Sequence, residues 1–173
     1  MVVKKSLVNN LLKFDEQGTT LVEAIVSVLI FSVGIIPSLT IILLANSFSS
    51  SIKNNLIASS LAQEGIEVVR AIRDNNWFNN RSFDSGLASG TYRIDWNSTS
   101  LLAEDVNPPL KLSSAGLYNY TSGADTGFQR RIIITKDPTV ACNCELKIIT
   151  EITWAERGKT QTITVESHLF NWR

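Results

Sequence analysis

Residues 18–45 read GTTLVEAIVSVLIFSVGIIPSLTIILLA, a stretch in which a single carboxylate, Glu23, precedes a long apolar run. The run from Ala24 to Ala45 contains no charged residue. As a helix with a rise of 1.5 Å per residue it would be roughly 33 Å long, which is enough to cross the hydrocarbon core of a bilayer. An acid at the edge of such a run is costly to place in hydrocarbon, so Glu23 is a candidate functional residue. We therefore expect a membrane-spanning helix with a carboxylate near its amino-terminal end.

Basic residues flank this run unequally. Lysines stand ahead of it at positions 4, 5 and 13, and the next basic residue, Lys53, follows after its end. Positively charged flanks favour the cytoplasmic side of a spanning helix. We therefore predict a single-pass protein of the inner, cytoplasmic membrane, with its leader inside the cell and the rest of the chain outside.

Two features in and beside the run have alternative interpretations. Pro37 removes a backbone hydrogen bond and predicts a kink near Val33 and Gly34, unless it is an ordinary proline of a membrane helix. Thr20 and Glu23 fit a capping box, in which both side chains accept hydrogen bonds from free amides at a helix start. Capping would not exclude a second role for Glu23.

The order of residues around Gly18 resembles the amino-terminal signal of type IV pilins and the related pseudopilins. In that family a membrane aspartyl peptidase, the prepilin peptidase, cuts after a glycine and methylates the new terminus, and a glutamate stands fifth in the mature chain. The resemblance implies cleavage after Gly18, with Thr19 as the new terminus and candidate site of N-methylation. It also implies recognition or assembly roles for Leu21 and Glu23.

The same resemblance implies how the chain works. Processed subunits leave the bilayer and pack helix against helix, so that Glu23 lies beside the amino terminus, Thr19, of a neighbour. A paired buried carboxylate offsets part of its desolvation and fixes the register between subunits. The implied partners are the prepilin peptidase, other pilin or pseudopilin subunits, the inner-membrane assembly platform and membrane lipid. The implied product is a type IV pilus-like or type II secretion filament.

An amphipathic helix is predicted to continue the apolar run as far as residue 76. Apolar residues recur at helical spacing, at Ile57, Leu61, Val68, Val69 and Ile72, whereas Glu64, Glu67, Arg70 and Arg73 fall on more exposed sides. Glu67 and Arg70, one turn apart, are expected to form a surface ion pair. The turn-favouring residues 74–76 predict the helix end, and Trp77 and Phe78 are expected to pack against a head. Residues 60–77, SLAQEGIEVVRAIRDNNW, resemble the corresponding helix of minor pilins of the PilV type.

The remainder of the chain is rich in strand-forming residues. Four strands are predicted from β-branched and aromatic enrichment, over residues 90–96, 128–135, 145–154 and 160–170. The last two form a predicted hairpin that turns at Glu156-Arg157-Gly158-Lys159, with alternating apolar residues on one face. Residues 97–127 are interpreted as a loop region with one short strand near 110–120.

These elements predict an α+β protein: a long amino-terminal transmembrane and amphipathic helix packed on a carboxy-terminal antiparallel sheet. The family resemblance implies the same, pilin-like architecture. The expected organisation is a cytoplasmic leader over residues 1–18, a transmembrane and assembly helix over 19–45, its continuation over 46–76, and a globular head over 77–173. At 173 residues the chain suits one such head.

Motifs for catalysis are not found in the sequence. The single histidine, His168, shares a strand face with Glu166 and lacks the spacing of a catalytic triad, a metal site or a phosphate loop. Scattered aspartates read as turn residues without the spacing of an EF-hand. A net charge of zero gives no case for nucleic-acid binding. We predict no enzyme activity, no cofactor and no metal site.

Other side chains have two interpretations each. Cys142 and Cys144 are best read as two small residues near a turn, with a local disulfide or a metal site as the alternative. Asparagines 80, 97 and 119 begin sequon patterns, which match often by chance. The aromatic residues Tyr118, Tyr120, Trp154 and Trp172 favour core and edge packing over a contact surface.

Two alternatives to a filament subunit remain open. Ala45-Asn46-Ser47 is a passable cleavage site for a secretory signal, although the apolar run is longer than such signals usually are. The second alternative is a membrane-anchored extracytoplasmic binding or enzyme domain that does not polymerise. Amino-terminal processing and crosslinking between subunits separate these hypotheses.

Overall fold

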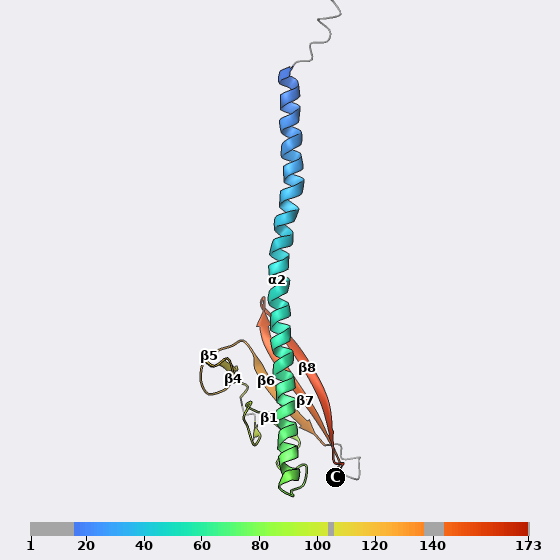
Figure 1. Cartoon of the computed structure of the whole chain (residues 1–173), viewed down its shortest axis with the longest axis vertical. Helices are drawn as coiled ribbons and strands as arrows, with labels where there is room; N and C mark the ends of the chain where they lie inside the picture. Colours follow the sequence, from blue (N-terminus) through green and yellow to red (C-terminus); the bar gives the residue numbers. More distant parts are fainter. Residues whose placement is uncertain (1–15, 104–105, 137–143, 173) are drawn as a thin grey trace, which may run out of the picture. The chain divides into compact units, whose positions relative to one another are not determined.

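The structure of the protein, a computed structural model, describes residues 16–103, 106–136 and 144–172. Of the expected leader, only residues 16–18 fall within this range. The chain divides into two compact units at the boundary between Ser50 and Ser51, and each unit is described by itself below. One helix, α2 (Glu16–Phe78), supplies the described residues of the first unit and the beginning of the second (Figure 1).

Helix α2 is 63 residues long and includes Pro37 in its interior. It begins three residues before the predicted start and ends two residues after the predicted end. Thr20 and Glu23 therefore lie inside the helix, and the prediction that they form a capping box at its start is wrong for the uncut chain. The preceding turn, which starts at Glu16, supplies the carbonyl groups that the amides of residues 20–22 need.

In the first unit, the apolar face of α2 is uncovered. Residues 20–46 are exposed along the whole segment, and α2 is long and apolar enough to cross a membrane. A helix that is apolar on every side and uncovered by protein is suited to lipid or to other helices. The structure thus agrees with the expectation of one candidate spanning helix.

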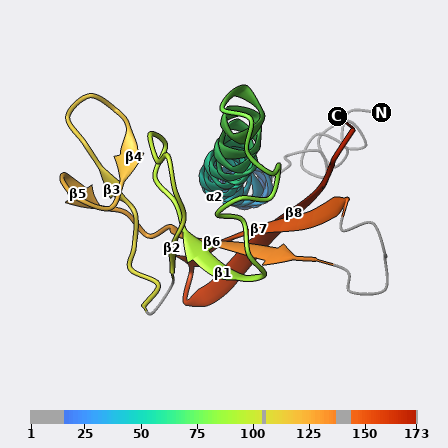
Figure 2. The same ribbon diagram turned by 90° about the horizontal axis from the view of Figure 1, so that it is seen from below.

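In the second unit, residues 51–78 of α2 lie on one face of a five-stranded antiparallel sheet (Figure 2). The order of the sheet is β2-β1-β6-β7-β8. The strands are β1 (Gly90–Arg93), β2 (Leu102–Ala103), β6 (Gln129–Thr135), β7 (Glu145–Glu156) and β8 (Lys159–Phe170). This helix-on-sheet arrangement confirms the predicted α+β layout, and all four predicted strands are present within a few residues of their expected bounds.

The hairpin of β7 and β8 is the largest pairing in the sheet, with register from Glu145↔Phe170 to Glu156↔Lys159. Its two-residue loop consists of Arg157 and Gly158, both with positive φ, at 52° and 74°. This geometry is that of the turn whose twist matches a right-handed hairpin. The predicted turn is therefore confirmed.

The core lies between α2 and the sheet. The predicted helical stripe is confirmed, because Leu61, Val68, Val69 and Ile72 are buried, and Ile57 is half-buried. Small residues bring the two layers close together: a Cβ added at Gly65 would lie 2.7 Å from the Cδ1 atom of Ile132. Glycine at position 65 thus sets how closely the helix approaches the sheet.

Residues 97–127 differ from the single short strand that was predicted there. Besides β2, they contain β3 (Lys111–Leu112), β4 (Tyr118–Asn119) and β5 (Ala124–Asp125), which form a separate sheet in the order β4-β3-β5. Each of these strands has only two residues. Such strands are too short to produce an alternating pattern, so periodicity could not reveal them.

The two aromatic residues at the end of α2 have different environments. Trp77 packs against the core, as expected. Phe78 is 84% exposed, so the prediction that it packs against the head is wrong. Helix α2 continues through both residues, and the rotation of about 100° per residue turns Phe78 away from the side that Trp77 uses.

Strand β8 forms one edge of the five-stranded sheet, and β2 forms the other. The solvent face near the end of β8 carries Glu166 and His168, and Lys147 of β7 lies 2.8 Å from Glu166. His168 also pairs with Glu145 of β7, through the other ring nitrogen from the one that contacts Glu166. This face of the sheet is therefore charged beside its long edge strand.

Candidate functional site

The amino-terminal motif lies in the first turns of α2. Positions 18 and 19, between which cleavage is expected, are helical and follow closely after the helix start at Glu16. Positions 19 and 23, four residues apart, lie one above the other on the helix. Leu21 is 63% exposed, and Glu23 is also exposed. The structure therefore presents Leu21 and Glu23 on an uncovered helix, without bringing other described parts of the chain to them.

The first unit presents large apolar side chains on all sides of α2. Exposed examples run from Leu21 through Ile30, Phe31 and Ile36 to Leu44, each at least half exposed. Isolated apolar side chains on a surface are ordinary, but a continuous helix of them indicates a membrane or a protein interface. This apolar surface therefore offers area for helix packing beside the single carboxylate of the motif, Glu23.

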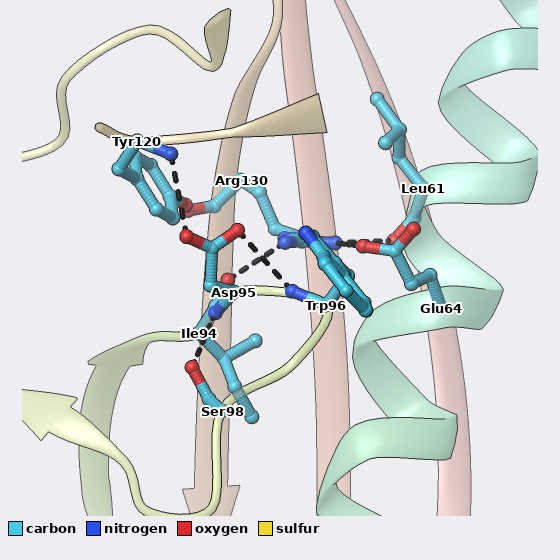
Figure 3. A network of polar contacts seen from close by, with 8 residues as sticks. All are labelled: Leu61, Glu64, Ile94, Asp95, Trp96, Ser98, Tyr120 and Arg130. Atoms are coloured by element: carbon cyan, nitrogen blue, oxygen red, sulfur yellow. Dashed lines mark hydrogen bonds and ion pairs between the residues drawn. The ribbon is translucent and has the colours of Figure 1, made fainter. Parts of the chain in front are cut away.

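In the second unit, the most elaborate polar cluster surrounds Arg130 of β6 (Figure 3). Its side chain is fully buried, and its Nη1 atom donates to the Oε1 atom of Glu64 at 2.6 Å and to the carbonyl of Leu61 at 3.3 Å. The Nη2 atom donates to the carbonyl of Ile94 at 2.7 Å. One guanidinium thus holds together β6, helix α2 and the segment after β1.

The same cluster extends to the loop after β4. The hydroxyl of Tyr120 donates to the carbonyl of Arg130 at 3.2 Å, and the amide of Tyr120 donates to Asp95 at 3.5 Å. The amide of Asp95 donates in turn to the hydroxyl of Ser98 at 2.8 Å. Because these partners are backbone groups and turn side chains, the cluster fixes the packing of four segments and does not offer a reactive group to a substrate.

Sequence reasoning missed this cluster. Glu64 was expected to be a solvated residue, but its carboxylate pairs with the buried Arg130. The sequence contains a pattern that indicates it. Residues at alternate positions of a strand point to one face, so Arg130 shares the face of Ile132 and Ile134. An arginine on the buried face requires an acceptor across the core, and Glu64 is the acid on the facing helix.

His168 lies among charged groups on the exposed face of the hairpin. Its Nε2 atom is 2.9 Å from Glu166, and its Nδ1 atom contacts Glu145. Hydrogen bonds to Glu145 and then Glu166 raise the pKa of His168 above its ordinary value. The expectation that His168 shares a face with Glu166 is confirmed. The groups that the structure places around the imidazole, Glu145 and Glu166, form a surface ion cluster with it.

The cysteine prediction requires correction. Cys144 is disulfide-bonded, so the preference for two unlinked small residues is wrong at this position, and the local-disulfide alternative is favoured. Cys142 lies outside the described residues. In the part of the chain that the structure describes, no group of three or more histidine, cysteine, aspartate or glutamate side chains could hold a metal ion.

The three sequon asparagines differ in accessibility. Asn80 and Asn97 are exposed, whereas Asn119 is only 7% exposed. The Oδ1 atom of Asn119 accepts hydrogen bonds from the amides of Thr121 and Ser122 at 2.9 and 2.8 Å. Asn119 is therefore a turn-forming residue whose side chain is largely inaccessible in the folded head.

The aromatic residues follow the core-packing prediction with one exception. Tyr118, Tyr120 and Trp154 pack in or against the core cluster that also contains Phe128. Trp172 is 70% exposed, and its ring lies edge-on to that of Trp77 at a centroid distance of 5.0 Å. The described carboxy-terminal end is thereby fastened to the end of α2.

Comparisons of the chain with protein-family models, with curated proteins and with solved structures find no match.

Proposed function

We propose that this chain is a minor pilin or pseudopilin subunit. In this proposal, the prepilin peptidase cuts after Gly18, and the inner-membrane assembly platform adds the mature subunit to a type IV pilus-like or type II secretion filament. The observation that carries the proposal is the placement of Glu23, five residues after Gly18, on a helix whose apolar side chains are exposed on every side. A pilin-like reading of the α+β head is part of the same proposal.

Cleavage after Gly18 would change the chemistry of the helix end. Helix α2 starts at Glu16, so the cut removes its first residues and leaves Thr19 at the terminus. The amides of residues 20–22 then lose their partners, and the nitrogen of Thr19 becomes a positive amino group that adds to the positive end of the helix dipole. Glycine at position 18 assists the cut, because it weakens a helix by about 1 kcal/mol relative to alanine and so lowers the cost of local unwinding.

Glu23 is suited to pair with such a terminus on a neighbouring subunit. When apolar helices pack together, an unpaired carboxylate between them costs several kcal/mol, and pairing it with a charged amine removes much of that cost. Only one axial offset between neighbours brings Glu23 to a partner's terminus. The pair thus specifies register, whereas the surrounding apolar side chains supply contact area.

The decisive experiment is the intact mass and amino-terminal sequence of the protein from membranes of cells with and without the prepilin peptidase. We expect a peptidase-dependent terminus at Thr19, and a mass increase of one methyl group if that terminus is methylated. Gly18→Ala should block the cut. Gly34→Ala is the matched control, because it alters another glycine of α2 with no atom within 4 Å of the added Cβ, and it should leave processing intact.

Other termini would support the alternatives. An uncut chain indicates an anchored extracytoplasmic binding or enzyme domain, and a terminus at Phe48 indicates a secreted domain. Either result contradicts the filament proposal. If Thr19 is the terminus, crosslinking of isolated filaments should then recover this chain bound to other subunits through the segment 19–45.

A further inference from the structure

The tip of the β7–β8 hairpin lies beside α2 at the beginning of the second unit (Figure 1). Glu156, the last residue of β7, accepts hydrogen bonds from Ser51, whose hydroxyl is in contact with its Oε1 atom, and from the side-chain amide of Asn54, whose Nδ2 atom lies 3.4 Å from its Oε2 atom. Ser51 follows Ala45, the last residue of the apolar run, by only six positions. The hairpin tip is therefore attached to the part of α2 that comes directly after the apolar run.

A cavity of about 280 Å³ lies between the hairpin tip and α2. Its lining includes Trp154 and the carboxylate of Glu156, and five side chains that carry hydrogen-bond donors: Ser51, Asn55, Arg157, Lys159 and Gln161. These side chains offer a hydroxyl, two amides, a guanidinium and an ammonium group, all of which can donate hydrogen bonds. Such a set of donors is suited to a phosphate group.

Basic residues outnumber acidic ones at the hairpin tip and on the nearby turn of α2. Arg157, Lys159 and Lys53 are exposed, and none forms a salt bridge with another residue that the structure describes. Glu156 is the opposing charge, and hydrogen bonds from Ser51 and Trp154 lower its pKa. Hydrogen bonds from α2 and from its own strand already engage Glu156, and Arg157 also attracts its charge, so three basic side chains stand against this one carboxylate.

The length of chain between Ala45 and Ser51 limits how far the cavity can lie from the expected membrane surface. Six residues of helix span about 9 Å, and the polar headgroup layer of a bilayer adds roughly 5 to 8 Å beyond each side of the hydrocarbon core. Arginine and lysine side chains are long enough to cover the difference between these two lengths. This step rests on the membrane insertion of residues 24–45 in the proposed function.

We propose that the hairpin tip binds the headgroups of anionic phospholipids in the leaflet that faces the head. A lipid phosphate enters the cavity beside Ser51, Arg157 and Lys159, and Lys53 contacts a neighbouring headgroup. Each basic side chain held near an anionic surface strengthens binding by about fivefold. Before assembly, this contact would hold the head at the membrane in one orientation.

Hydrogen exchange of the full-length protein in lipid nanodiscs tests the proposal. One set of discs contains phosphatidylcholine alone, and the other also contains phosphatidylglycerol. We expect amide exchange in residues 156–161 to slow by about fivefold or more in the anionic discs. The double variant Arg157→Asn, Lys159→Gln should abolish this difference. Asparagine is chosen at position 157 because it tolerates the positive φ found there.

Matched controls separate the site from general charge. Arg70→Gln, Arg81→Gln removes two other basic residues and should keep the anionic-lipid effect. Equal exchange in both kinds of disc, or equal loss in the control variant, would overturn the proposal. The same holds if inorganic phosphate added to phosphatidylcholine discs reproduces the protection, because the site would then bind the free ion and not the lipid surface.

The outcome is independent of filament assembly. A chain that does not remain in the discs contradicts membrane insertion, and with it the lipid contact. An uncut Gly18–Thr19 bond in cells contradicts only the filament function, since an anchored head could still hold lipid headgroups.

Discussion

Arg130 and Glu64 join strand β6 to helix α2 through an ion pair of 2.6 Å, in which the arginine side chain is fully buried and the glutamate side chain is 34% exposed. The pair is asymmetric, because Arg130 also donates to the carbonyls of Leu61 and Ile94. Removing the arginine leaves acceptors unsatisfied in the core, whereas removing the glutamate leaves a buried cation with two carbonyl partners. Both changes break a contact that links the two layers of the head.

Arg130→Met should lower the free energy of unfolding by about 3 to 5 kcal/mol, the usual cost of breaking a buried ion pair. Glu64→Gln should cost less, since Glu64 is partly solvated and glutamine can still accept a hydrogen bond. Urea denaturation followed by circular dichroism measures both. Arg131→Met is the control, because Arg131 points to the other face of the same strand and its ion pair with Glu151 is longer, at 3.7 Å. An Arg130 variant no less stable than the control would contradict the role of the pair.

Glu23→Ala and Glu23→Lys should insert into the membrane normally and fail to enter filaments. In the proposed filament, both variants would lose the pairing with the amino terminus of a neighbouring subunit, and lysine would replace it with repulsion between two positive charges. The measurement compares the amount of each variant in the membrane fraction with that in sheared filaments. Glu67→Ala, which alters a glutamate in a surface pair of the second unit, is the control. Normal incorporation of both Glu23 variants would count decisively against the proposed role.

Gly158→Ala should destabilise the head by about 1 to 2 kcal/mol, because φ at Gly158 is +74° and an L-residue is strained in this region. The space around an added Cβ is open at this position, so the effect reports on backbone conformation alone. Gly127→Ala is the matched control, with open space and no positive φ. A thermal denaturation series should show a lower midpoint only for the Gly158 variant, and equal midpoints would mean that the turn tolerates a side chain.

His168 should contribute to stability in a pH-dependent manner. Glu145 and Glu166 raise its folded-state pKa above the ordinary 6.5. Lys147, on the same face, forms a salt bridge with Glu166. A group whose pKa is raised by folding stabilises fully below its unfolded pKa, and this contribution disappears as the pH rises through the folded value. His168→Gln should therefore lower the denaturation midpoint below pH 6.5 and have little effect well above the raised pKa. The effect should be small and salt-sensitive, since the cluster is exposed.

Much of the fold follows from patterns that span many residues. The stripe on α2 and the alternation in β6, β7 and β8 predicted the layers because each pattern repeats over several turns or pleats. The two-residue strands β3, β4 and β5 carry no such repeat, and their pairing depends on contacts between loops. Gly123 illustrates this dependence, because an added Cβ would lie 2.2 Å from the carbonyl oxygen of Leu112.

The candidate sites divide in the same way. The motif from Gly18 to Glu23 is local in sequence and could be found without a structure, although its position inside a helix could not. The Arg130–Glu64 pair joins residues 66 positions apart. Charge alone suggested solvent for Glu64, and only the parity of Arg130 within its strand pointed to the core.

Strand β8, with 12 residues, has β7 as its only partner strand among the described residues, so no described strand pairs with the other side of its backbone. Long open strand edges promote association between unrelated chains during synthesis and storage. The polar side chains of Glu166 and His168 near the end of this strand oppose edge-to-edge pairing, because a second strand along the edge would bring its own side chains against them. Replacing these residues with apolar ones would thus promote aggregation at high protein concentration before it lowered the stability of the fold.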